Sequence, residues 1–150
     1  MKDLQGSVIP QFLYHGSDFN YFWATAATTY EGVSLEMLSS EGENLPAGAK
    51  AHAIDSLRAI HAQGVLHDDV ALRNAVWRLS DRTVLWIDFE RCTVLDEDLD
   101  AEKFAVEARA EEMKLEELLS AGRFGRVCNA GELHTLRHSF PHDRYTVNTV

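Results

Sequence analysis

Apolar and polar positions recur at two different spacings along the chain, and these spacings predict most of its elements. Helical spacing over residues 50–63, followed by Gly64, predicts a helix that ends before this glycine. Its apolar positions are Ile54, Leu57 and Ile60. The stretch 101–120 has the same period, and we expect a long helix ended by Gly122. The apolar side of that helix carries Phe104, Ala108, Leu115, Leu118 and Leu119.

The N-terminal third favours strands. Residues 6–16 form an apolar stretch punctuated by Pro10 and Gly16, and residues 21–30 are rich in aromatic and β-branched side chains. Both are predicted to be strands. Residues 33–40 are a short helix candidate, and residues 41–48 form a loop with Gly, Asn and Pro.

A hairpin is predicted further along the chain. The segments "AVWRL" (75–79) and "TVLWI" (83–87) read as strands separated by three polar residues. If the turn centres on Asp81, Asn74 and Asp88 each lie seven residues away and face each other at the open end.

The loop "VLHDDVALRN" (65–74) leads into this hairpin and carries the candidate chemistry. Asp69 and Asn74 from the loop converge with Asp88 from the far end of the hairpin. Clustered carboxylates repel unless a cation neutralises them, and oxygen ligands of this kind suit Mg²⁺. Asp69 would then be free to orient a hydroxyl nucleophile and to accept its proton, as phosphoryl transfer requires.

These motifs resemble those of the protein-kinase-like superfamily. "HDDVALRN" is similar to the His-Arg-Asp catalytic loop with its later Asn, and "WIDFE" is similar to the strand that ends in Asp-Phe-Gly. "LRAIHAQGVLH" resembles the helix and strand that precede the loop. "LQGSVIP" and "TTYEGVSL" resemble the fourth and fifth strands and the hinge, particularly in fungal protein-kinase-like proteins. The resemblance covers about residues 3–120.

The resemblance implies a role for each matching residue. Asp69 would be the catalytic base, and Asn74 and Asp88 would be the magnesium ligands. His67 would be a scaffold residue of the loop, and Asp68 would face away from the site. Residues Thr28, Thr29, Tyr30, Glu31 and Gly32 would offer backbone groups to the adenine of ATP. The implied cofactors are therefore ATP and Mg²⁺.

The implied fold is α+β and protein-kinase-like, with a mainly helical large lobe, a few strands of the small lobe and hinge, and an incomplete small lobe. A single partial domain would span 1–150, with small-lobe strands and hinge over about 1–34 and the large lobe over about 35–150. No Gly-rich loop or strand lysine stands ahead of the fourth-strand match, so we expect impaired transfer.

Two positions depart from the motifs. Asp68 stands in place of the arginine that pairs with a phosphorylated activation loop, so we expect no such control. Glu90 stands in place of the motif glycine, and the same "IDFE" pattern occurs in relatives that phosphorylate small molecules. These departures weaken the case for a protein substrate, and the resemblance implies an acceptor that is a hydroxyl of a protein or of a small molecule.

Composition limits the compartment and the classes of partner that we expect for the protein. The net charge of −10 argues against non-specific binding to nucleic acid, and no apolar run is long enough for a bilayer span. Only two cysteines are present and the N-terminus lacks a secretory pattern, so we expect a cytoplasmic protein with neither a nucleic-acid nor a membrane partner. Ten acidic and three basic residues fall between Asp96 and Glu117, which we interpret as an acidic loop followed by a solvated helix face.

Other residues have plainer interpretations. His61 is expected to be a packing histidine and Cys92 a packed thiol. His134, His138 and His142, with Cys128 upstream, are expected at the surface, because Pro141 would break a helix that shares a metal between them.

Three functions therefore stay open. They are an ATP-dependent kinase, a catalytically inactive pseudokinase or interaction module, and a regulatory domain that binds metal through the C-terminal histidines.

Overall fold

The computed structural model of the 150-residue chain describes residues 2–18, 23–40, 44–95 and 100–121. Over these residues the structure is mixed α+β, with three α-helices and small antiparallel sheets, as predicted. The helices are α1 (Leu35–Ser40), α2 (Ala49–His61) and α3 (Ala101–Ser120), and the short 3-10 helices are η1 (Lys2–Leu4) and η2 (Leu72–Asn74).

The described strands form three separate antiparallel sheets. Their bounds are β1 (Phe12–Asp18), β2 (Trp23–Thr28), β3 (Val33–Ser34), β4 (Val65–Leu66), β5 (Ala75–Arg78), β6 (Thr83–Trp86) and β7 (Thr93–Val94). β1 pairs with β2, β5 lies between β3 and β6, and β4 pairs with β7. The last pairing places the start of the loop 65–74 beside the segment that follows Asp88.

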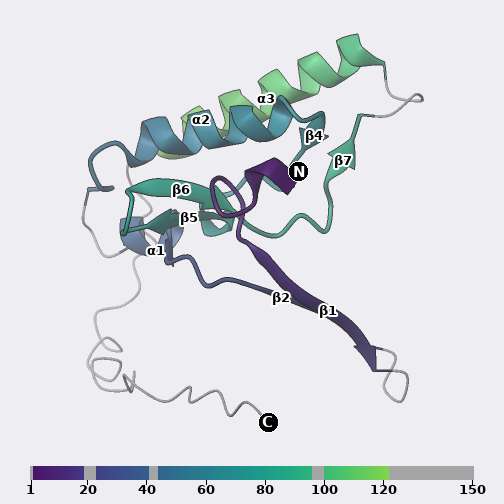
Figure 1. The fold of residues 1–150 in the computed structure, drawn as a ribbon. Helices are drawn as coiled ribbons and strands as arrows, with labels where there is room; N and C mark the ends of the chain where they lie inside the picture. Colours follow the sequence, from purple (N-terminus) through teal and green to yellow (C-terminus); the bar gives the residue numbers. More distant parts are fainter. Residues whose placement is uncertain (1, 19–22, 41–43, 96–99, 122–150) are drawn as a thin grey trace, which may run out of the picture.

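Helix α2 forms the middle layer. It contacts β6 on one side and α3 on the other, and the two helices lie side by side above the β5–β6 hairpin (Figure 1). Its buried side chains include Leu57 and Ile60, both with no exposed surface. Burying an aliphatic side chain of this size stabilises a fold by about 1.5–3 kcal/mol. The amphipathic pattern of α2 is thus what attaches it to the sheet.

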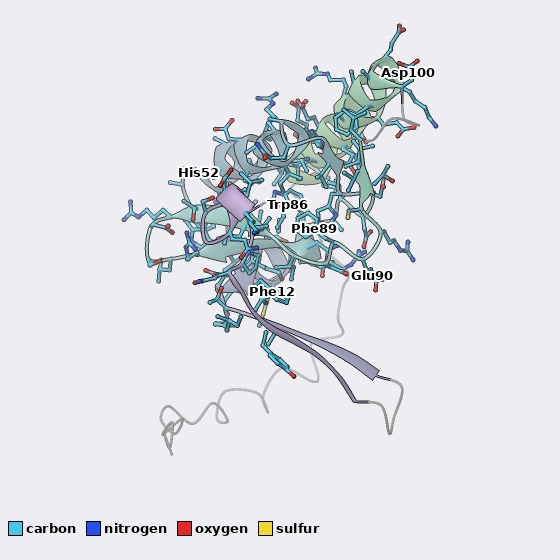
Figure 2. The ribbon with its side chains drawn as sticks, turned by 45° about the vertical axis from the view of Figure 1, so that its right-hand side comes forward. Phe12, His52, Trp86, Phe89, Glu90 and Asp100 are labelled. Carbon is cyan, nitrogen blue, oxygen red and sulfur yellow. The ribbon has the colours of Figure 1, made fainter. Side chains whose placement is uncertain are left out.

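Trp86 anchors the core from β6. Its side chain is fully buried, and its Nε1 donates to the Ser56 hydroxyl of α2 over 2.9 Å. Figure 2 shows Trp86 inside the molecule, whereas Glu90 and Asp100 lie at its edge. The hydroxyl satisfies an indole N–H that burial would otherwise leave without a partner, which fixes the distance between α2 and the hairpin.

The β1–β2 hairpin projects away from the rest of the fold (Figure 1). Three consecutive large side chains of β1, those of Phe12, Leu13 and Tyr14, are exposed. The strand begins at Phe12, later than predicted, because the chain from Leu4 to Ile9 folds into turns closed by bonds such as Val8 N to Leu4 O at 3.0 Å.

Most predicted elements are confirmed. The helix expected over 50–63 spans Ala49–His61 and stops before Gly64, whose φ is +71°. The helix expected over 101–120 spans Ala101–Ser120. It begins after Asp100, whose carboxylate accepts from the Glu102 N–H at 2.9 Å and so caps the helix. Residues 33–40 divide into β3 and α1, because Val33 and Ser34 pair with β5 before the helix starts.

The predicted hairpin register is wrong by one residue. Ala75 pairs with Trp86 and Arg78 with Thr83, so four residues rather than three form the connection. Leu79 joins the turn and is 79% exposed, and Arg82 adopts a left-handed backbone with φ +57°. The turn is held by Asp81, which accepts two bonds from Arg78 at 2.9 and 2.6 Å. Asn74 therefore faces Ile87, and Asp88 lies one residue beyond.

No helix in the described part of the chain is long and apolar enough to cross a membrane.

Candidate functional site

The loop 65–74 is joined to the segment around Asp88 by His67. The imidazole is fully buried, and its Nε2 lies 3.0 Å from the Ile87 carbonyl oxygen. The ring also packs at 5.1 Å from Trp86 and 4.7 Å from Phe89, measured between ring centroids. A buried ring with these contacts holds two chain segments together, which is the scaffold position expected for it.

Asp69 and Asn74 are in direct contact within the loop. The Asn74 Nδ2 donates to the Asp69 backbone oxygen at 2.9 Å and to its carboxylate Oδ2 at 3.1 Å. Arg73 donates to the same Oδ2 at 2.6 Å. The bond from Arg73, aided by that from Asn74, lowers the pKa of Asp69 below its ordinary range despite some burial. Asp69 is therefore anionic at neutral pH.

Asp88 is linked to Asn74 only through the backbone of the residue that precedes it. The Ile87 N–H donates to the Asn74 carbonyl oxygen at 2.9 Å, so Asp88 begins just past the last rung of the β5–β6 ladder. Its side chain is exposed. Among the described residues, the non-glycine residues with positive φ are Asp68 (58°), Arg82 (57°) and Asp88 (68°). Two of them flank the site, and such backbone outliers gather at functional sites.

The five residues predicted at the hinge line one cavity of about 290 Å³. The lining consists of Pro10, Thr28, Thr29, Tyr30, Glu31, Gly32, Val76 and Ile87. Ile87 immediately precedes Asp88 in the chain, whereas Asp69, Asn74 and Asp88 do not line this cavity. Gly32 has φ +139°, and a Cβ at this position would lie 2.2 Å from the Trp77 carbonyl oxygen, which no other residue tolerates without movement.

The Glu31 carboxylate is hydrogen-bonded within a polar network. It contacts the Thr29 hydroxyl, and Arg78 donates to it at 2.8 Å while also binding Asp81. Burial acts to raise the pKa of Glu31, but the bonds from Thr29 and Arg78 outweigh it and lower the pKa. The Asp81 bond raises the pKa of Arg78, and in turn Arg78 lowers the pKa of Asp81 to about 2. The network ties the segment 29–31 to the turn of the β5–β6 hairpin.

Sequence reasoning missed Glu111. This residue of α3 has an 11% exposed side chain and binds the loop, and its neighbour Glu112, 15% exposed, binds Arg58 at 2.9 Å. The predicted solvated face is therefore wrong for these two acids. A signal was available, because position 111 falls on the apolar stripe of Phe104, Ala108 and Leu115. A carboxylate on that stripe indicates a buried partner.

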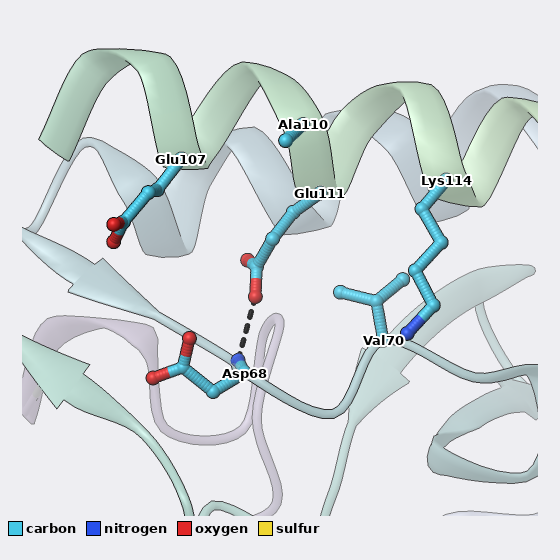
Figure 3. A pocket seen from close by; sticks show the side chains of 6 residues that line it. All are labelled: Asp68, Val70, Glu107, Ala110, Glu111 and Lys114. Carbon is cyan, nitrogen blue, oxygen red and sulfur yellow. Dashed lines mark hydrogen bonds between the residues drawn. The ribbon is translucent and has the colours of Figure 1, made fainter. Parts of the chain in front are cut away.

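Glu111 also lines a second cavity, of about 260 Å³, between α3 and the loop. Its lining residues, shown in Figure 3, are Asp68, Val70, Glu107, Ala110, Glu111 and Lys114. In this view Glu111 reaches down from the helix to the Asp68 backbone, whereas the Glu107 carboxylate lies one turn away without a bond to the loop.

The described residues contain no group of three His, Cys, Asp or Glu side chains that could hold a metal ion. The predicted ligand pair of one amide and one carboxylate, Asn74 and Asp88, is smaller than such a group. It suits Mg²⁺, which keeps several waters and shares its shell with phosphate oxygens.

The remaining predicted positions have mixed outcomes. His61 is 8% exposed and binds Glu111, so its packing role is confirmed. Cys92 is a free thiol, half-buried against the core, as predicted. His134, His138, His142 and Cys128 lie outside the described residues.

Comparison with protein-family models finds no match for this chain. A search of curated proteins finds none either.

Proposed function

We propose that the protein is a protein-kinase-like phosphotransferase that moves the γ-phosphate of ATP to a hydroxyl of a protein or a small molecule, with Mg²⁺. One observation carries the proposal. Asp69 and Asn74 contact each other, and Ile87, the residue before Asp88, both donates its N–H to the Asn74 carbonyl oxygen and lines the cavity bordered by Thr28–Gly32.

The cavity supports the nucleotide part of the proposal. Its volume, about 290 Å³, is near the lower end of the range for small-ligand sites, roughly 300 Å³. Val76 and Ile87 would supply apolar faces for a planar ring, and backbone groups of Thr28–Gly32 would meet its edge, except the Thr29 N–H, which already donates to the Gln11 carbonyl oxygen at 2.9 Å. Phosphates that extend from such a ring past Ile87 would approach Asp88.

Asn74 and Asp88 would hold Mg²⁺ between them. The bonds from Asn74 to Asp69 use its Nδ2 atom, so the amide oxygen would be the ligand. A bound Mg²⁺ supplies charge neutralisation for phosphate oxygens. The chain fixes the position of the Asn74 ligand, since Asn74 is 3% exposed and held by the loop, whereas the Asp88 side chain is exposed.

Asp69 would orient the acceptor hydroxyl. A carboxylate with a lowered pKa is a weak base, so it suits a reaction in which the proton leaves late. Phosphoryl transfer through a loose transition state is of this kind, because little bond formation to the nucleophile precedes departure of the phosphoryl group. Asp69 accepts a hydrogen bond from the hydroxyl first and its proton afterwards.

The alternative is a module that binds nucleotide or a partner without transfer. The 2.6 Å ion pair between Arg73 and Asp69 favours it, because the bond occupies one oxygen of the proposed base. Transfer activity in the wild type and its loss in Asp69→Asn would favour the phosphotransferase over the binding module.

Thermal unfolding of the 150-residue chain with and without Mg·ATP tests the nucleotide site. At about 100 times the dissociation constant, the ligand should raise the melting temperature by roughly 5–10 °C. Asp88→Asn should abolish this shift, and Asp55→Asn should retain it, since Asp55 is 73% exposed on α2. Absence of a shift in the wild type contradicts the proposal.

A further inference from the structure

Residues 29–32 cross from one sheet to another. β2 ends at Thr28 and β3 begins at Val33, and the two strands belong to separate sheets. The cavity of about 290 Å³ takes its lining from both ends of this crossing, namely from Pro10 and residues 28–32 and from Val76 and Ile87. Val76 belongs to β5, the partner of β3, and Ile87 follows β6. The cavity therefore keeps its width only if the crossing keeps its place relative to the β5–β6 hairpin.

An ion pair joins the crossing to the hairpin. Arg78 of β5 donates from Nη1 to Glu31 Oε2 at 2.8 Å, and the two side chains are 18% and 9% exposed. At this degree of burial water screens the two charges less than it screens a surface pair, so the bond holds its geometry more firmly. Because Glu31 lines the cavity, the bond connects the cavity lining to β5.

Further bonds fix both partners of this pair. The Arg78 guanidinium also donates from Nε and Nη2 to the two carboxylate oxygens of Asp81, at 2.9 and 2.6 Å. Because the guanidinium is planar, these two bonds also fix the direction in which its Nη1 points toward Glu31. From the other side, the Thr29 hydroxyl donates to Glu31 Oε1, and the Thr29 N–H donates to the Gln11 carbonyl oxygen at 2.9 Å. The Glu31 carboxylate is thus bonded on both of its oxygens.

Close backbone packing accompanies the ion pair. A Cβ at Gly32 would lie 2.2 Å from the Trp77 carbonyl oxygen, so the chain at Gly32 runs directly against β5. Glu31 and Gly32 are consecutive in the chain, as are Trp77 and Arg78. Two adjacent residues of the crossing therefore meet two adjacent residues of β5, one pair through charge and the other through the backbone. Two such contacts restrain both the distance and the direction of the crossing.

We propose that Arg78 is a positioning residue, which acts through Glu31 to hold the cavity lining of residues 28–32 at a fixed separation from the β5–β6 hairpin. Under the proposed function this cavity binds the adenine of ATP. A planar ring needs contact on both of its faces, and dispersion contacts weaken steeply when a gap of about 0.5–1 Å opens. For nucleotide binding the inference therefore rests on the proposed function, whereas the restraint on the crossing does not.

Limited proteolysis of the full chain with chymotrypsin tests the restraint without nucleotide. The protease takes a large apolar side chain before the cleaved bond, and Tyr30, directly before Glu31, is 87% exposed. Cleavage there requires local opening of the crossing. In Arg78→Met, which leaves the sequence around this bond unchanged, we expect cleavage after Tyr30 to be about tenfold faster. Cleavage after Tyr14, which is 61% exposed on β1, should keep its wild-type rate.

Asp81→Asn is the matched control, because it weakens the other ion pair of the same guanidinium and keeps the bond to Glu31. Its cleavage after Tyr30 should stay within about twofold of wild type. Three outcomes would overturn the inference: unchanged cleavage after Tyr30 in Arg78→Met, equal acceleration in Asp81→Asn, or acceleration by one common factor after Tyr30 and Tyr14, which reports global destabilisation. If Arg78→Met does not fold, Glu31→Gln with Arg78→Met decides by the same criteria, because it leaves neither charge buried without a partner.

Calorimetric titration with adenosine and with Mg·ATP extends the test to the cavity. Arg78→Met should raise both dissociation constants by the same factor, about tenfold or more, because the displaced lining affects the ring that the two ligands share. Arg78→Lys, which keeps a charge within reach of Glu31, should stay within about threefold of wild type for both. An unchanged dissociation constant for adenosine in Arg78→Met would overturn the role in the cavity. Failure of the proposed function is distinguishable, because it appears as absence of Mg·ATP binding in the wild type, where the proteolysis result still decides the restraint.

Discussion

Replacement of Gly32 by alanine should weaken the fold where β3 meets β5. Gly32 has φ +139°, and the added Cβ would lie 2.2 Å from the Trp77 carbonyl oxygen and 3.2 Å from its carbonyl carbon. These are backbone atoms of β5, whose Trp77 pairs with Val33, so neither side can give way without loss of the β3–β5 ladder.

The expected loss of stability in Gly32→Ala combines two free-energy costs. A side chain in a glycine-only backbone region costs about 1–3 kcal/mol, and displacement of packed neighbours costs about 1–3 kcal/mol more. We therefore expect a loss of about 2–6 kcal/mol in the free energy of unfolding, which lowers the melting temperature by roughly 4–24 °C. Urea denaturation followed by tryptophan fluorescence measures the free energy directly.

Gly6→Ala is the matched control. Gly6 also has positive φ, +77°, but a Cβ there meets nothing within 4 Å. Backbone strain of about 1 kcal/mol is partly offset by the reduced entropy of the unfolded chain, so the net change should stay within about 1 kcal/mol. Equal losses in the two variants would refute the argument that close approach to Trp77 requires glycine at position 32.

Three further predictions follow from other contacts. Asp69→Asn should lower phosphate transfer by about 10²–10⁴-fold in a radiolabel assay while the Mg·ATP thermal shift persists. Ser56→Ala should cost about 1–3 kcal/mol in urea unfolding, because it orphans the buried Trp86 N–H, whereas Trp86→Phe with Ser56→Ala should show a cost that is less than additive. Because the pKa of Glu111 is lowered in the folded state, its anion adds stability that is fully present above the ordinary pKa of 4.5 and is lost as pH falls through the folded-state pKa. The stability gap between wild type and Glu111→Gln should therefore stay constant from pH 7 to about pH 5 and narrow below pH 4.5, and a gap that does not narrow there would contradict this.

Local patterns determined the elements of this protein. The period of Phe104, Ala108 and Leu115 predicted α3 and its buried face, and the strand–turn–strand pattern predicted the β5–β6 hairpin. Asp69 and Asn74 are in contact because they are five residues apart in one short loop, which keeps their side chains close together. These predictions succeeded because side-chain spacing and turn chemistry act within a few residues of each other.

Tertiary structure decided what those elements bring together. The register of the hairpin depended on whether Leu79 paired or joined the turn, and Arg78, which holds this turn through Asp81, is also bonded to Glu31, 47 residues away in sequence. Contact of Glu111 with His67 and Asp68 depends on the rotation of α3 and on its packing against α2. Likewise, Val76 and Ile87 complete the hinge cavity only because β3 pairs with β5. Periodicity gives each helix or strand its buried face, but the partner of a polar atom on that face is set by long-range packing, which no local pattern encodes.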